Sequence, residues 1–271
     1  MMKKIIFFLI VILTATYSFG QVVGQDYYNR GNAKRASGDY RGAITDYTKA
    51  IELNPAFADA YNNRGLSKDK LQDYKGAIAD YSKVIELNPD YVLAYYNRGV
   101  AKRASGDYIG AIVDYTKAIE LNPTDADAYN NRGNAKQKLS DNKGAINDFN
   151  KAIELNPEYV MAFYNRGCSK YYLKDYRGAI ADYNKAIELN PAFADAYNNR
   201  GIAKFELQDY RGSIADFTNA IELKPDYAFA YYNRGGGKFE LKDLKGACFD
   251  WRKAGELGFS TAYDIIKLNC K

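Results

Sequence analysis

Histidine is absent from the 271 residues, and cysteine, methionine and tryptophan are rare, with three, three and one copies. Without histidine the chain has no Ser-His-Asp or Cys-His nucleophile, and it lacks a frequent zinc ligand. The cysteines at 168, 248 and 270 do not have the C-x-x-C spacing of a metal knuckle. No acid–base dyad or phosphate-binding loop stands out. We therefore expect a protein that is not an enzyme and uses no cofactor or metal.

Long apolar runs are also absent, except near the start of the chain. Lys3 and Lys4 precede an apolar run from Ile5 to Leu13, and small residues follow at Ser18 and Gly20. This layout predicts a secretory signal peptide over residues 1–20, cleaved after Gly20, and hence an exported protein that is periplasmic or secreted. An uncleaved membrane anchor is the alternative, but the charge-free stretch is short against the ~20 residues that a spanning helix needs.

The charge balance shows no strong excess of one sign. The chain has 38 basic and 33 acidic residues, a net charge of +5, and loss of Lys3 and Lys4 with the signal peptide would leave +3. Nucleic-acid and membrane-surface proteins usually carry clustered basic residues. We therefore expect neither a nucleic-acid partner nor, after signal cleavage, a stable membrane span.

What the chain does have is a repeat of 34 residues. An Arg-Gly pair returns at this interval, with its arginines at Arg30, Arg64, Arg98, Arg132, Arg166, Arg200 and Arg234. Aligned on the recurring prolines, the units are 24–57, 58–91, 92–125, 126–159, 160–193, 194–227 and 228–261. A fixed period of this length predicts stacked repeats, so we expect one elongated domain over residues 21–261.

Each unit has the pattern of two helices. In the second unit Ala77, Ile78, Tyr81, Val84 and Ile85 have the spacing of one helix face. Asp73, in the turn before this stripe, is a candidate N-cap, and the Asn-Pro at the end of the unit stops the second helix. The sequence therefore predicts helix, turn, helix and stop, seven times.

These features resemble the tetratricopeptide repeat (TPR) family over residues 24–261. The match includes an aromatic residue at place four of the unit, glycine at place eight, alanine at place twenty, an aromatic residue at place twenty-four and proline at place thirty-two. Small residues such as Gly65 and Ala77 let the two helices approach closely. The resemblance implies an all-α, right-handed α-solenoid superhelix whose first helices line a concave groove.

Two places depart from the family pattern. Place seven is arginine and place eleven is lysine in every unit, where the family usually has leucine and tyrosine. An aspartate lies sixteen residues after each arginine, as Asp80 does after Arg64. Because a lone buried charge is costly, we predict seven buried or half-buried Arg–Asp ion pairs that join the two helices of each unit, rather than a binding role for the arginines.

The last unit ends differently. Phe259 replaces the expected proline, and the apolar residues of 262–271 predict a C-terminal capping helix. Cys248 lies at a core place and Cys270 in the cap, so either a disulfide in an exported protein or two buried free thiols is expected. Cys168 would be left over as a small filler.

One face of the first helices carries an unbroken series of amides at place six: Asn29, Asn63, Asn97, Asn131, Asn165, Asn199 and Asn233. A primary amide donates and accepts hydrogen bonds, so such a series suits a peptide backbone. It resembles the asparagine ladder in the groove of O-GlcNAc transferase. Inheritance by recent duplication is the alternative, although place nine on the same face varies freely.

A second pattern on this face has a period of two units. Place five is tyrosine in odd units (Tyr28, Tyr96, Tyr164, Tyr232) and asparagine in even units. Place two is apolar in units three, five and seven and acidic in the even units (Asp59, Asp127, Asp195). We therefore expect a scaffold that binds an extended, partly basic segment of a partner protein in the groove. The alternative is a structural or assembly component of the cell envelope that uses its outer face or ends.

Overall fold

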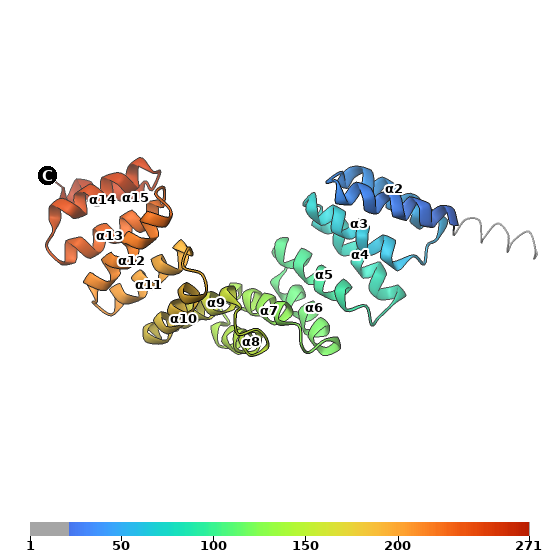
Figure 1. Cartoon of the computed structure of the whole chain (residues 1–271), viewed down its shortest axis with the longest axis horizontal. Coiled ribbons are helices and arrows are strands. Elements are labelled where there is room, and N and C mark those ends of the chain that lie inside the picture. The colour runs from blue at the N-terminus through green and yellow to red at the C-terminus, as the bar shows by residue number, and fades with distance from the viewer. Residues whose placement is uncertain (1–21, 271) are drawn as a thin grey trace, which may run out of the picture. The chain divides into compact units, whose positions relative to one another are not determined.

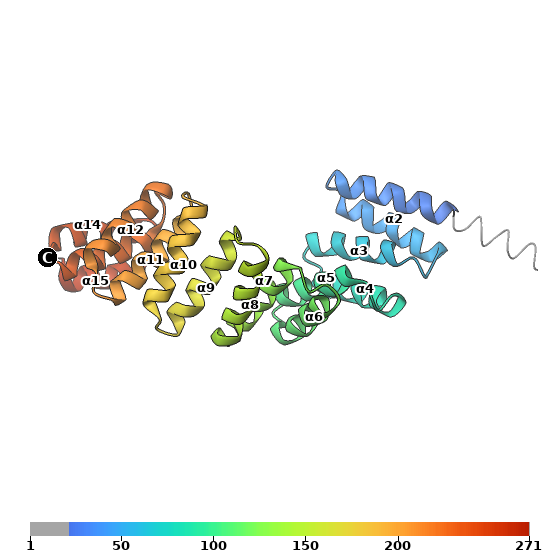
Figure 2. The ribbon, with the colours of Figure 1, turned by 60° about the horizontal axis from the view of Figure 1, so that its bottom comes forward.

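The computed structural model describes residues 22–270, which form fifteen helices and contain no strand (Figures 1 and 2). The predicted signal peptide and its cleavage point lie outside the described residues. The predicted all-α architecture of stacked helix pairs is confirmed.

The helices come in pairs that follow the 34-residue period. The helix over residues 22–36 comes before α2 (Tyr40–Leu53). The later first helices are α3 (Ala58–Lys70), α5 (Val92–Ala104), α7 (Ala126–Lys138), α9 (Val160–Tyr172), α11 (Ala194–Glu206) and α13 (Ala228–Glu240). The later second helices are α4 (Tyr74–Leu87), α6 (Tyr108–Leu121), α8 (Asn142–Leu155), α10 (Tyr176–Leu189), α12 (Tyr210–Leu223) and α14 (Leu244–Glu256). A shorter helix, α15 (Thr261–Asn269), ends the array.

The chain forms two compact units, one up to Ala135 and one from Lys136. In the first unit α2, α3, α4, α5 and α6 pack in chain order, and in the second α8 to α15 do the same. Nearest-neighbour packing explains why such an array divides, because no shared core holds distant helices together.

The turn inside each pair is fixed by an aspartate and a glycine. Asp73 caps α4 by accepting a hydrogen bond from the backbone N–H of Gly76 at 3.0 Å. A Cβ on Gly76 would lie 2.2 Å from Asp73 Oδ2, so a larger residue here would require the capping carboxylate to shift. The N-cap predicted for Asp73 is confirmed, and it recurs at Asp39, Asp107, Asp141, Asp175, Asp209 and Asp243.

A second glycine sets the spacing of the two helices. A Cβ on Gly65 of α3 would lie 2.8 Å from Cε1 of Tyr81 on α4, which is closer than real Cβ contacts come. This fits the expected close approach. The aromatic residue at place twenty-four is buried in each pair from α2 onward, as Tyr47, Tyr81, Tyr115, Phe149, Tyr183, Phe217 and Trp251.

The helix α15 covers the end of the second compact unit. Ala262 is buried, and the ring of Phe259, just before the helix, lies 4.7 Å from the rings of Phe229 and Tyr232. Cys270 is joined to Cys248 of α14 by a disulfide, with 5.7 Å between the Cα atoms. Cys168 remains as a free thiol.

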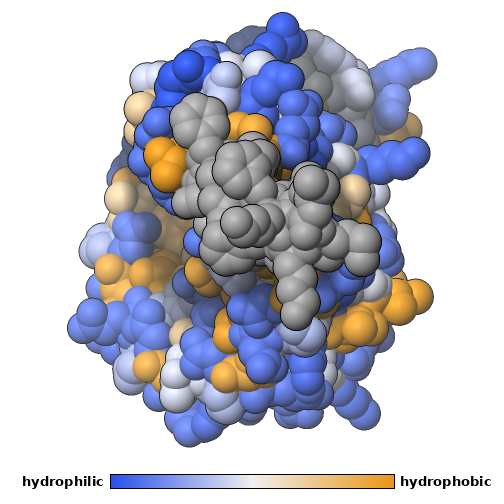
Figure 3. All heavy atoms as spheres, turned by 90° about the vertical axis from the view of Figure 1, so that its right-hand side faces the viewer, coloured by the Kyte–Doolittle hydropathy of each residue, from blue (hydrophilic) through white to orange (hydrophobic). Residues whose placement is uncertain are grey.

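The face drawn in Figure 3 is mainly polar where its residues are coloured. Figure 3 shows apolar residues in small, separated groups on the face that looks toward the viewer. Between residues 22 and 270, no helix combines the length and the apolar character that crossing a bilayer requires.

Candidate partner-binding face

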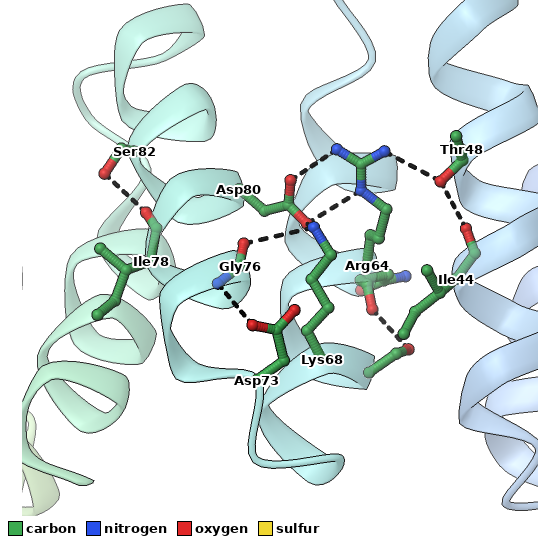
Figure 4. Close-up of polar contacts among 11 residues, drawn as sticks. Ile44, Thr48, Arg64, Lys68, Asp73, Gly76, Ile78, Asp80 and Ser82 are labelled. Carbon is green, nitrogen blue, oxygen red and sulfur yellow. Dashed lines mark hydrogen bonds and ion pairs between the residues drawn. The ribbon is translucent and has the colours of Figure 1, made fainter. Parts of the chain in front are cut away.

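The arginine of place seven forms a two-pronged contact with the aspartate sixteen residues later. Arg64 Nε donates to Asp80 Oδ2 at 3.0 Å, and its Nη2 donates to Oδ1 at 2.6 Å (Figure 4). The predicted ion pairs are confirmed as Arg30–Asp46, Arg64–Asp80, Arg98–Asp114, Arg166–Asp182, Arg200–Asp216 and Arg234–Asp250. Because a fork of two donors matches a carboxylate, lysine could not replace this contact.

The lysine of place eleven approaches the same carboxylate. Lys68 Nζ lies 2.7 Å from Asp80 Oδ2, and all seven units have such a pair at 2.7–2.8 Å. These lysines stood out in the sequence, but no partner was predicted for them. Their position four residues after each arginine, on the same helix face, was the signal that pointed to the shared carboxylate.

The arginine also contacts the preceding repeat. Arg64 Nη1 donates to Thr48 Oγ1 of α2 at 3.1 Å (Figure 4). Equivalent bonds join later arginines to Ser82, Thr116, Asn150, Asn184 and Thr218. Within residues 22–270 no repeat precedes that of Arg30, and its side chain is 57% exposed against 15% for Arg64. The arginine therefore holds repeats together, in line with the structural role expected for it.

The place-six amides in even repeats hydrogen-bond to the preceding repeat. Asn63 Nδ2 donates to the hydroxyl of Tyr28 at 3.0 Å and to Asn32 Oδ1 at 2.9 Å. Asn131 and Asn199 donate in the same way to Tyr96 and Tyr164, each at 2.9 Å. The oxygen of Asn63 accepts from Asn62 Nδ2 at 3.3 Å, so both ends of this amide are engaged inside the protein.

Two amides of odd repeats each donate one hydrogen bond to the preceding repeat. Asn97 Nδ2 donates to Asn62 Oδ1, and Asn233 Nδ2 donates to Asn198 Oδ1, both at 3.3 Å. Asn165 is buried, whereas Asn29 is exposed at the start of the array. The seven amides therefore differ in how much of each remains for a ligand, which the uniform sequence did not reveal.

The tyrosine rings of place five pack against other aromatic rings. The ring of Tyr28 lies 4.8 Å from that of Phe57, and Tyr164 has the same relation to Phe193. Their even-repeat equivalents, Asn62, Asn130 and Asn198, are buried. The period of two repeats thus alternates a large ring with a small amide along the first helices.

The place-two residues lie on the surface. Leu93, Met161 and Phe229 are 56%, 43% and 55% exposed. The carboxylates that alternate with them, Asp59, Asp127 and Asp195, are also exposed. The hydroxyl of Tyr91 donates to Asp59 Oδ1 at 3.0 Å, and burial together with this carboxylate raises the pKa of Tyr91 to about 12. Each compact unit thus carries apolar and acidic residues on what we call its first-helix face, formed by places two, five, six, nine and thirteen.

Two cavities in the second compact unit were not foreseen from the sequence. The larger of these two, of about 290 Å³, is lined by places nine, twelve, thirteen and twenty-four of repeat six together with residues of repeat seven and Ile265. The smaller, of about 160 Å³, is lined by the same four places of repeat five and by Asn199 and Ile202 of repeat six. Variation at places nine and twelve was the only signal in the sequence.

The first-helix face contains one free thiol, that of Cys168. Burial raises the pKa of the Cys168 thiol, which keeps it in its less nucleophilic form. Within the described part of the chain, no three metal-ligating side chains come together.

Family models and solved structures match the chain. Models described as TPR repeat match residues 31–68, 99–140 and 169–208, and models described as tetratricopeptide repeat match 58–91, 126–159, 194–227 and 81–113. No curated protein was found to match the chain.

Three solved structures illustrate the likeness. The crystal structure of MamA is 29% identical, with 60% of this chain and 96% of that chain covered and a TM-score of 0.58. YrrB, described as a TPR protein with an unusual peptide-binding site, is 26% identical, with 68% and 95% covered and a TM-score of 0.59. A tetratricopeptide repeat protein from Parabacteroides merdae shares the fold at 20% identity, with 92% and 99% covered and a TM-score of 0.69. Such proteins typically act as non-enzymatic scaffolds for protein–protein interaction, and the chain, on its repeats and its matches, belongs to the tetratricopeptide repeat family.

Proposed function

We propose that this protein is a non-enzymatic scaffold that binds an extended segment of a partner protein on its first-helix face. The observation that carries this proposal is the alternation of exposed apolar and acidic side chains at place two. Leu93 follows Asp59 in the first compact unit, and Phe229 follows Asp195 in the second, each by one repeat.

The alternation suits a segment with apolar and basic residues in turn. Adjacent helices pack about 8–10 Å apart, and an extended chain rises about 3.3 Å per residue, which gives roughly three residues of partner per repeat. Like residues of the partner would then recur about six residues apart, because the pattern repeats every two units. Single exposed apolar residues are common, so it is their register with the carboxylates that supports a binding role.

The amides have divided roles in this proposal. Asn63, Asn131 and Asn199 chiefly hold neighbouring first helices through the tyrosine hydroxyls. The oxygens of Asn97 and Asn233 accept no hydrogen bond from residues 22–270, so they are suited to a backbone N–H of the partner. The peptide-binding site described for YrrB, a similar repeat protein, supports a peptide ligand for this chain.

Capture of the partner tests the proposal. The chain from Gln21, without the predicted signal peptide, is used as bait in an envelope extract, because we propose that the protein is exported. We expect a specific protein to be captured, and its affinity for the purified bait to fall at least tenfold when Asp59, Asp127 and Asp195 are changed to asparagine. This change keeps the acceptor that Tyr91 uses and removes only the charge.

The matched control changes three exposed glutamates of the second helices, Glu52, Glu120 and Glu188, to glutamine. The control should bind as the unchanged protein does. A partner held equally well by the aspartate variant would contradict the proposal and favour an assembly role for the outer face or ends.

A further inference from the structure

Two of the cavities in the second compact unit are copies of one feature. Each is lined by places nine, twelve, thirteen and twenty-four of one repeat and by places six and nine of the next. We call them the five–six cavity, which includes Cys168 and Tyr171, and the six–seven cavity, which includes Phe205 and Trp251. Ile202 lies in the wall of both, so the cavities are direct neighbours.

Both cavities belong to the first-helix face. Places six, nine and thirteen are part of that face, and the amides of Asn199 and Asn233 lie in the cavity walls. Three of the place-six and place-five residues expected to bind a partner, Asn199, Asn233 and Tyr232, therefore line them. A ligand on this face passes directly over the cavities.

The walls select apolar groups. Phe205, Phe217 and Trp251 line the six–seven cavity, and Tyr171, Tyr172 and Tyr183 line the five–six cavity. Three polar groups of the smaller cavity are paired with one another, since Tyr183 donates to the Cys168 sulfur at 3.5 Å and Asn199 Nδ2 donates to it at 3.6 Å. An apolar cavity of about 150 Å³ can hold benzene, so both volumes suffice for an apolar side chain.

One carboxylate lies at the edge of the cavities. Glu206 lines the six–seven cavity, is exposed at the end of α11, and accepts a hydrogen bond from Tyr171 of the five–six cavity at 3.5 Å. Within the described residues it forms no ion pair with a lysine or arginine. A partner with a basic residue beside its apolar ones would supply the missing charge.

The spacing of the cavities indicates the shape of the partner. They are one repeat apart and share Ile202 as a wall, and the first helices α11 and α13 contact each other, so we take the spacing of the cavities as on the order of 10 Å. In a polyproline-II segment, residues i and i+3 lie on one side and about 9 Å apart, because the helix has three residues per turn and rises 3.1 Å per residue. In a flat strand, same-side residues lie about 7 or 13 Å apart, which does not fit.

We propose that the two cavities are sockets for two apolar side chains, three residues apart, in a basic polyproline-II segment of the partner protein. The smaller socket takes an aliphatic side chain and the larger an aromatic one. This inference rests on the proposed function and names the chemistry of the segment that the second compact unit binds.

Gly236 gives a direct way to close the larger socket. A Cβ on Gly236 would meet only Phe205 Cε2, at 3.8 Å, so the G236L variant places its side chain into open space. Leucine also favours a helix more than glycine does, so folding should not suffer. The C168L variant closes the smaller socket, and Leu66 already occupies the equivalent place in repeat two. The control is A215L, which adds the same side chain at an exposed site on α12.

Three synthetic peptides of equal composition serve as probes. They are Lys-Pro-Leu-Pro-Pro-Phe-Pro-Lys, with the apolar residues three apart, and the two rearrangements Lys-Pro-Leu-Pro-Phe-Pro-Pro-Lys and Lys-Leu-Pro-Pro-Pro-Phe-Pro-Lys, with spacings of two and four. Each is also made with leucine and phenylalanine exchanged, because either chain direction is possible. Fluorescence anisotropy measures their binding to the chain from Gln21.

We expect a peptide with a spacing of three to bind at least tenfold more tightly than the other spacings. G236L and C168L should each weaken it about tenfold or more, the loss expected for one apolar side chain kept out of its socket. A215L should bind as the unchanged protein does, and thermal unfolding should show both socket variants folded.

Equal binding at all spacings, full binding to the socket-closed variants, or no binding of any peptide would each overturn the sockets. The proposed function would survive these results if the partner captured from the extract still depended on Asp59, Asp127 and Asp195. It would fail separately if capture ignored those residues.

Discussion

At the scale of single residues, Arg64 links its own helix to two others. It lies on α3, bonds to Asp80 of α4 and reaches Thr48 of α2. The family usually has leucine at this place. In this chain, charge-assisted hydrogen bonds of the arginine therefore stand where other members have an apolar packing contact. Such a network is favourable only when every member is paired, and here arginine, aspartate and lysine all are.

This arrangement predicts the effect of R64A. Removal of one member of a buried pair usually costs 3–5 kcal/mol, but Lys68 still pairs with Asp80, so we expect a loss of about 2–3 kcal/mol in the free energy of unfolding. Urea denaturation measures this loss. R30A is the matched comparison and should cost less than about 1 kcal/mol, because the Arg30 side chain is largely exposed. Equal costs for R64A and R30A, or for R64A and the exposed K75A, would contradict the role assigned to the arginine.

The carboxyl of Asp46 predicts a pH dependence. Its hydrogen bond from Arg30, assisted by Lys34, lowers its pKa from 3.8 to about 2. Because the folded pKa is depressed, the stabilisation by the charged form is complete above about pH 4 and is lost as the pH falls toward 2. The carboxyl carbon of Asp46 followed by NMR should titrate near pH 2. A midpoint close to 3.8 would show that the ion pair is not populated in solution.

At the scale of elements, the helices owe their ends to aspartate, glycine and proline, and the last helix owes its place to a disulfide. Only Ala262 of α15 is buried, and Leu268 is 75% exposed. The burial of one alanine contributes little to the stability of a helix of nine residues. The disulfide between Cys248 and Cys270 therefore matters more here than it would in a larger core.

We expect C270S to lower the free energy of unfolding by about 3 kcal/mol, the chain-entropy value for a link across 22 residues. Calorimetry with and without a reducing agent measures the effect. Reductant should lower the melting temperature of the unchanged protein and leave that of C270S where it is. Mass spectrometry that finds both thiols free in the exported protein would contradict the disulfide.

At the scale of the whole molecule, the repeat that matters is a pair of units, 68 residues long, rather than the single unit of 34. Tyr28 in an odd repeat is followed by the small, buried Asn62 in the next. Two odd repeats in succession would bring a second tyrosine to the place of that asparagine. The array should therefore tolerate the loss of two repeats better than the loss of one.

Two deletions in the first compact unit test this expectation. Removal of residues 58–125 places repeat four after repeat one and keeps the odd–even order, with Asn131 able to donate to Tyr28 as it now does to Tyr96. Removal of residues 58–91 alone places two odd repeats side by side. We expect the shorter protein to unfold at the same or a higher urea concentration than the longer one, although array stability normally rises with repeat number. A clearly more stable single-repeat deletion would show that the alternation has no energetic role.

Many features of this fold could be predicted from the sequence, because the contacts that define them lie within one unit and recur in every unit. The period of 34 residues, the Asp73 cap, the close approach at Gly65 and the pairing of Arg64 with Asp80 all follow from residues within one unit. Charges and glycines placed at a fixed offset in every copy leave few ways to fold. Duplicated units by themselves therefore determined the helices, their pairing and the ion pairs.

Only the tertiary structure decided what happens between repeats. It gave the uniform asparagines unequal surroundings, with Asn63 engaged at both ends and Asn97 at one. It also placed Ile202 between two cavities that form only where places of successive repeats meet. Sequence periodicity fixes which side chains share a helix face, but the volume left between two such faces depends on how the helices pack.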